Sequence, residues 1–193
     1  MGKHFEKNLP EGYHEVYRLD AKNSKIGVIF NLVAFFVTLA ISAAAIFIIK
    51  PYQDIASFRF LSYIIFFLSI LLYVVLHEIV HGIAYKALTK EKLTFGISLT
   101  VAFCGVPNIY VYRKTALVAL LSPFVVFTVV FLAGAFLLSN PWDQFLCSVL
   151  LGIHVGGCSG DLYDTGLYLF RFRSADTLMR DTGPMQVFYE KDR

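Results

Sequence analysis

The sequence predicts an all-α integral membrane protein with four transmembrane helices, and three observations support this fold class. Hydrophobic residues make up 57% of the 193 residues and charged residues only 16%, against roughly 45–50% and about 25% in typical soluble domains. Four long stretches contain almost no Asp, Glu, Lys or Arg, and the basic residues gather between them. A soluble domain of this size cannot bury so much apolar surface, so we expect lipid to solvate part of the chain.

The four stretches each exceed the roughly 20 apolar residues that a membrane-spanning helix needs. Only Glu78 interrupts the second stretch, and only Asp161 and Asp164 interrupt the fourth. The first helix is expected to stay uncleaved, because the 25 residues before it are too long and too mixed in charge for the basic segment of a signal peptide. The expected helices cover approximately residues 27–49, 60–86, 116–138 and 144–170.

The distribution of Lys and Arg sets the expected orientation. Residues 1–25, 86–114 and 171–193 carry 15 of the 17 basic residues, and the loop 50–59 carries the other two. Because loops rich in Lys and Arg stay in the cytoplasm, both termini are expected there. The sequence therefore predicts a multi-pass protein of the cell membrane, embedded in the lipid bilayer.

The chain is expected to form a single membrane domain over residues 1–193. Its parts would be a cytoplasmic N-terminal segment (1–26), a four-helix membrane core (27–172) and a polar cytoplasmic tail (173–193). A net charge of +3 is too small to indicate nucleic acid as a partner. The three cysteines indicate no disulfide framework, and no pattern in the sequence specifies an oligomeric state.

The segment 93–112 lacks formal charges but contains the helix breakers Gly105 and Pro107 among β-branched residues. We expect a short re-entrant or β-hairpin loop between the second and third helices. Such backbone is tolerated at membrane depth only where protein or water covers it. A fifth span is the alternative, but it would place Lys92 and Arg113 on opposite sides of the membrane.

The second helix carries His77-Glu78-Ile79-Val80-His81, an H-E-x-x-H motif. Histidines four residues apart share one helical face, so both imidazoles can reach one metal ion. Glu78 is rotated by about 100° and can reach a water at that ion. The alternative is a helix end whose polar groups reach lipid headgroups, but His77 lies about 13 Å inside Lys86 along a helix. The motif therefore predicts a metal site.

A catalytic zinc site needs a third protein ligand, and Asp161 of the fourth helix is expected to supply it. Seventeen residues separate Arg59 from His77, and seventeen separate Asp143 from Asp161. The two polar sites should therefore lie at nearly equal depth. The small residues Gly156, Gly157, Ser159 and Gly160 would let the fourth helix approach the second closely.

Three other residues of the fourth helix leave alternatives open. Asp164 is the alternative third ligand, and either aspartate could instead pair helices without a metal. His154 lies about 10 Å from Asp161 along the helix, which suits a pocket residue or a buried histidine with satisfied hydrogen bonds. Cys158 suits a small packing residue better than a ligand.

The motif is followed by the loop 104–108, by Leu121-Ser122-Pro123 and by Gly160-Asp161. In this order the elements resemble the family known as "putative zincin peptidase", over roughly residues 60–172, and that family is similar to the site-2 class of intramembrane metalloproteases. Site-2 proteases usually carry an Asn-Pro-Asp-Gly-like or Leu-Asp-Gly-like motif at the third ligand. This chain has Ser-Gly-Asp-Leu at 159–162, so Asp161 matches by position.

The resemblance implies a zinc-dependent endopeptidase that hydrolyses a peptide or membrane-protein substrate in or near the membrane, whereas composition and spacing imply only a buried metal site. Zn²⁺ would be held by His77, His81 and Asp161, with Glu78 as general base. Asn108 would bind the substrate backbone if its loop folds back, or else be an ordinary turn residue. Two other functions stay open: a metal-dependent membrane hydrolase of a lipid or amide, and an inactive membrane scaffold.

Overall fold

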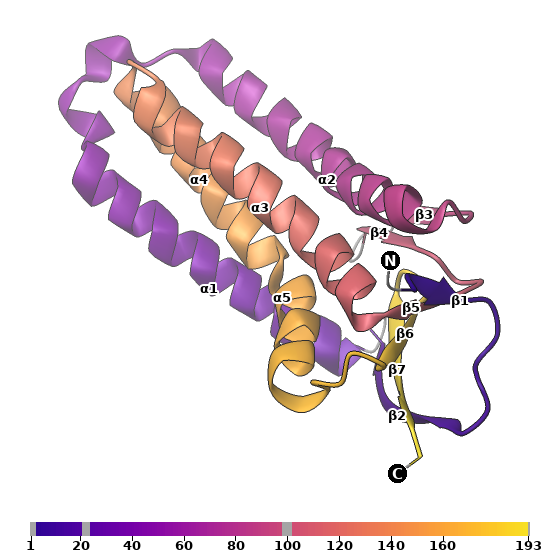
Figure 1. The fold of residues 1–193 in the computed structure, drawn as a ribbon. Coiled ribbons are helices and arrows are strands. Elements are labelled where there is room, and N and C mark those ends of the chain that lie inside the picture. Colours follow the sequence, from indigo (N-terminus) through magenta and orange to yellow (C-terminus); the bar gives the residue numbers. More distant parts are fainter. Residues whose placement is uncertain (1–2, 21–23, 98–101, 193) are drawn as a thin grey trace. The chain divides into compact units, whose positions relative to one another are not determined.

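Apolar helices make up most of the computed structural model, which describes residues 3–20, 24–97 and 102–192 (Figure 1). Among these residues, three helices are long and apolar enough to cross a membrane. The last two helical segments, Pro141–Gly157 and Ser159–Arg171, meet at a bend of 44° and would form a fourth span if counted together. The helices are α1 (Ser24–Ile49), α2 (Phe60–Thr89), α3 (Arg113–Leu137), α4 (Pro141–Gly157) and α5 (Ser159–Gly166), and a π-helical segment (Leu167–Arg171) follows α5.

Short polar connections begin and end these helices. Two 3₁₀ turns, Pro51–Gln53 and Ile55–Ser57, join α1 to α2. The side chain of Asn140 accepts hydrogen bonds from the first backbone amides of α4, where Pro141 occupies the first helical position. An Asn cap followed by Pro satisfies or removes amide hydrogens that would otherwise lack partners.

The prediction of an all-α fold is wrong, because the chain also forms an antiparallel sheet of five strands in the order β1-β5-β6-β7-β2. Four of the five strands lie in segments that the sequence assigned to a cytoplasmic N-terminal segment and a polar tail. The pairing partners in this sheet are far apart in sequence: Tyr13 pairs with Lys191. The strands are β1 (Phe5–Glu6), β2 (Tyr13–Asp20), β5 (Tyr110–Tyr112), β6 (Leu178–Asp181) and β7 (Met185–Lys191).

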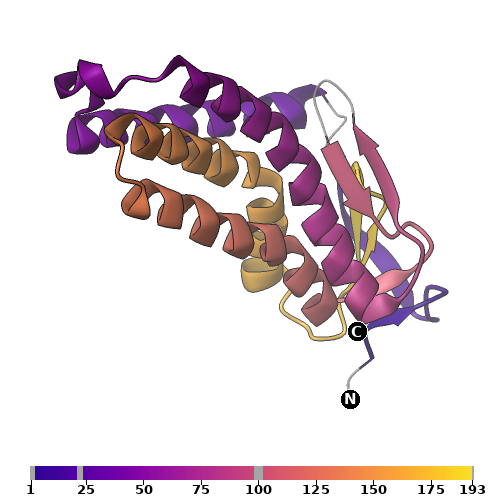
Figure 2. The same cartoon turned by 90° about the horizontal axis from the view of Figure 1, so that it is seen from above.

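The segment between α2 and α3 contains the predicted β-hairpin. Strand β3 (Thr94–Ile97) pairs with β4 (Ala102–Gly105) in antiparallel register. Residues 98–101 lie outside the described residues. The described residues of this segment form strands and turns rather than a fifth span. The hairpin lies beside α2 (Figure 2), where a Cβ added to Gly82 would come within 2.7 Å of the Phe95 ring.

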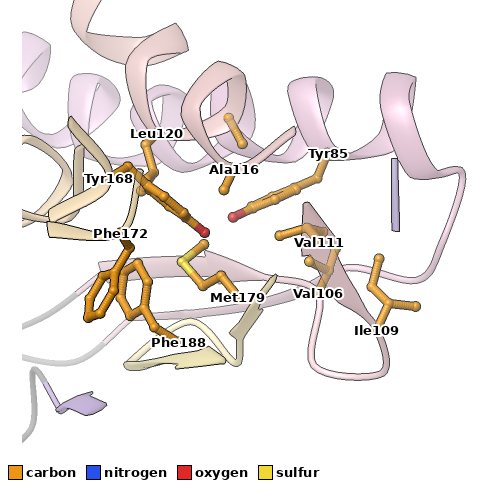
Figure 3. Packing of buried hydrophobic residues seen from close by; sticks show 11 residues of the cluster. Tyr85, Val106, Ile109, Val111, Ala116, Leu120, Tyr168, Phe172, Met179 and Phe188 are labelled. Atoms are coloured by element: carbon orange, nitrogen blue, oxygen red, sulfur yellow. The ribbon is translucent and has the colours of Figure 1, made fainter. Parts of the chain in front are cut away.

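The chain divides into two compact units. The first consists of residues 1–27, 76–123 and 160–193, and contains both sheets. Its core joins aromatic and aliphatic side chains from α2, α3, the π-helical segment and the sheet (Figure 3). The core residues are Tyr85, Val106, Ile109, Val111, Ala116, Ala119, Leu120, Tyr168, Phe172, Met179 and Phe188.

The second unit, residues 28–75 and 124–159, is helical. A Cβ on Gly156 of α4 would lie 2.6 Å from the backbone oxygen of Ala34 in α1, and one on Gly152 would lie 3.1 Å from the Cα of Thr38. These two glycines therefore bring α4 against α1. The expectation that Gly156 serves an approach to the second helix is wrong, because its closest contacts are with the α1 backbone.

Candidate metal centre

Two histidines of α2 and one aspartate of α5 converge in the first unit. His77 and His81 lie one turn apart on α2, and their ring centroids are 4.9 Å apart. The Asp161 Oδ2 atom lies 3.4 Å from the Nε2 atom of His77 and 3.4 Å from that of His81. Both imidazoles are buried and the Asp161 side chain is 21% exposed. The three potential ligand atoms lie within 4.8 Å of one another.

The donor set and its spacing fit a zinc ion. Tetrahedral zinc binds imidazole nitrogen and carboxylate oxygen at about 2.0–2.1 Å, which places the ligand atoms about 3.3–3.4 Å from each other. The two nitrogen-to-oxygen distances of 3.4 Å agree with this spacing and are long for direct hydrogen bonds. Two imidazoles and one carboxylate also leave the fourth position that catalytic zinc sites keep for water or substrate.

The orientation of His81 is fixed from its other ring nitrogen. Its Nδ1 atom lies 2.9 Å from the backbone oxygen of Ala119 in α3. A carbonyl oxygen only accepts hydrogen bonds, so Nδ1 donates the proton. In the neutral ring this leaves the lone pair on Nε2, the atom that lies 3.4 Å from Asp161. Hydrogen bonds of this kind orient most metal-binding histidines and set their tautomer.

Glu78 is half-buried on the adjacent side of α2. It lies four residues before Gly82, so the two share one helical face. Since Phe95 of β3 packs against Gly82, the β3–β4 hairpin lies about one helical turn from the Glu78 side chain. Glu78 therefore lies on the face of α2 that the hairpin covers, about 100° around the helix from His77.

The other candidates from the sequence occupy different places. Asp164 is buried, and its Oδ1 atom has no hydrogen-bond partner among the described residues. His154 belongs to the second unit, where its Nδ1 lies 2.9 Å from the hydroxyl of Tyr73 and its Nε2 lies 3.1 Å from the backbone oxygen of Phe124. These contacts match a buried histidine with satisfied hydrogen bonds.

Cys158 and Asn108, the two remaining candidates from the sequence, lie at the end of α4 and in a turn. Cys158 is fully buried at the end of α4, with its Sγ 3.6 Å from the Nδ1 of His154, which suits a packing residue. Asn108 is exposed in the turn between β4 and β5. Its role in binding a substrate stays a prediction.

The sequence did not predict a buried carboxyl group that contacts α2, the helix of His77 and His81. Tyr85 lies one turn beyond His81, and its hydroxyl donates a 2.7 Å hydrogen bond to Oδ2 of Asp181 in β6. The backbone amide of Gly183 donates to the Oδ1 atom of the same carboxylate at 2.8 Å. Burial raises the pKa of Asp181 to about 6, although these two hydrogen bonds act in the opposite direction. The spacing of four residues between His81 and Tyr85 indicates that both side chains share one face of the helix. Asp181 lies in the segment 173–193, for which the sequence predicts only a polar tail.

Tyr85 and Tyr168 extend into the core with their hydroxyl groups toward each other (Figure 3). Nearby, burial and the charge of Asp181 raise the pKa of Cys104 to about 12. A thiol with this pKa stays protonated at neutral pH and is a poor nucleophile or metal ligand.

Comparison with known proteins gives one family. The family described as "Putative zincin peptidase" matches residues 70–175, more than half of the chain. The matched region includes the H-E-x-x-H motif, Pro123 and Asp161. No curated protein and no solved structure matches the chain.

Proposed function

The chain belongs to the "putative zincin peptidase" family, and on that premise we propose that it is a zinc-dependent endopeptidase acting within or beside a membrane. The observation that carries the proposal is the convergence of His77, His81 and Asp161 with the 3.4 Å spacing of tetrahedral zinc ligands. The same family implies zinc as the metal.

In this proposal the metal activates water and substrate, and the side chains of the protein transfer the proton and orient the metal ligands. Bound zinc would supply a Lewis acid that polarises the peptide carbonyl and lowers the pKa of water. Glu78 then takes a proton from the attacking water and returns it to the amine nitrogen as the peptide C–N bond breaks. The Ala119 carbonyl keeps the Nε2 of His81 directed at the site throughout.

A lipid surrounding is supported by the apolar side chains that the helices leave uncovered. Phe47 of α1 is 72% exposed, Phe67 of α2 63% and Val129 of α3 62%. Exposed apolar surface on this scale marks a membrane or protein contact. We place both termini in the cytoplasm, following the basic residues of the terminal segments.

The proposed substrate is an extended stretch of a peptide or membrane protein. In the two-stranded sheet of the described residues, β3 pairs with β4 along one edge. Phe95 and Ile97 of β3 are more than half exposed. A peptide pairing with the other edge of β3 would have its backbone hydrogen-bonded in extended form, beside the face of α2 that carries Glu78.

The test is the full chain in detergent micelles, wild type against Glu78→Gln, with zinc content measured on both. The probes are fluorescently labelled casein and a labelled single-span membrane peptide. The variant should bind zinc as the wild type does, while cleavage falls by about 10²–10⁴-fold with the loss of the general base. Retained cleavage by the variant would refute the role of Glu78. A wild type that hydrolyses a lipid ester but neither peptide probe would refute the peptidase.

A further inference from the structure

The Leu121-Ser122-Pro123 segment has no role in the chemistry described so far, yet it adjoins the metal centre. Pro123 lies inside α3, ten residues after the helix begins. Proline has no backbone N–H, so the carbonyl four residues earlier receives no helical hydrogen bond, and the ring pushes that carbonyl outward. The carbonyl four residues before Pro123 is that of Ala119.

The Ala119 carbonyl is the group that holds His81. Its oxygen accepts from Nδ1 of His81 at 2.9 Å and from the Ser122 hydroxyl at 2.9 Å. Ala119 itself is fully buried, so water cannot take the place of either donor. With any residue other than proline at position 123, a backbone N–H would point at the same oxygen.

We propose that Pro123 is a positioning residue of the metal centre, which frees the Ala119 carbonyl to fix the tautomer and rotation of His81. The inference rests on the proposed function, since the fixed Nε2 is the one that faces Asp161 at 3.4 Å. The proline acts through a backbone oxygen and a histidine ring. In this role the pyrrolidine ring of Pro123 contacts neither substrate nor metal.

The direct test is Pro123→Ala, which returns the N–H to the helix. The zinc dissociation constant, measured on the full chain in micelles by chelator competition, should rise about tenfold, as for loss of an outer-shell partner. Ser122→Ala is the matched control, because it removes a donor from the same carbonyl without adding a competitor. Its zinc dissociation constant should stay within about twofold of wild type, while the loss of one hydrogen bond affects stability only modestly.

A merely structural role of the proline would lower the melting temperature of Pro123→Ala and leave its zinc dissociation constant at the wild-type value. That result would overturn the proposal. If the variant does not fold, ¹⁵N NMR of histidine-labelled wild type, free of metal, provides a second measurement. His81 should carry a proton on Nδ1 whether its ring is neutral or charged, and an unprotonated Nδ1 would overturn the proposal. A wild type that binds no zinc would count against the proposed function, whereas the tautomer would still test the hydrogen bond.

Discussion

Asp181 should make the stability of this protein fall as pH rises above about 4. Its pKa is about 6 in the folded chain, against an ordinary value of 3.8, because burial disfavours the carboxylate. The folded state therefore holds the proton more tightly than the unfolded state. The resulting stabilisation is complete below about pH 4 and is lost as pH rises through 6. A shift of about 2 units at 1.36 kcal/mol each gives about 3 kcal/mol.

Asp181→Asn isolates this contribution, because asparagine has a similar shape and no charge at any pH. Other acids act in the opposite direction: a hydrogen bond from Tyr112 lowers the pKa of Glu6, and one from Arg18 lowers the pKa of Glu15. These groups are common to both proteins and cancel in the difference.

The measurement is chemical denaturation of both proteins in the same micelles at several pH values from 4 to 8. The unfolding free energy of wild type minus that of the variant should decrease by about 2–3 kcal/mol over this range, since a small part of the titration lies below pH 4. Any fixed cost of placing an amide beside Tyr85 shifts the whole curve without changing its slope. A difference that is constant with pH would refute the placement of Asp181 as a buried carboxyl.

Two further changes test the metal centre and the helix packing. Asp161→Ala should weaken zinc binding by more than the 10–100-fold typical of outer-shell losses, and unchanged metal content in the purified variant would contradict the assigned ligand. Gly156→Ala should destabilise the fold by about 1–3 kcal/mol, because its Cβ would lie 2.6 Å from the Ala34 backbone oxygen. Gly157→Ala is the matched control, since the nearest atom to its Cβ would be the Tyr73 hydroxyl oxygen, at 3.9 Å. Equal melting temperatures of the two variants in thermal denaturation would argue against the close approach of α4 to α1.

The residues of the candidate site could be predicted from the sequence because their spacing follows helical periodicity. The positions of His77 and His81 on one face need only a helix, and Asp161 was placed by counting residues along two apolar stretches. The hydrogen bond from His81 to Ala119 could not be predicted from the sequence, because every residue has a backbone carbonyl and the residue type does not show which one accepts. Pro123 was visible in the sequence, but its effect appears only when the neighbouring helix is known.

The sequence by itself determined the apolar helices, the hairpin before α3 and the metal-binding pattern, since each depends on composition or local spacing. Only the tertiary structure decided that both terminal segments form one sheet, because β2 and β7 stabilise each other across most of the chain length. It also decided that Asp181 lies buried against Tyr85. Pairings between distant segments depend on which surfaces meet after folding, so the local pattern of one segment alone does not identify its partner.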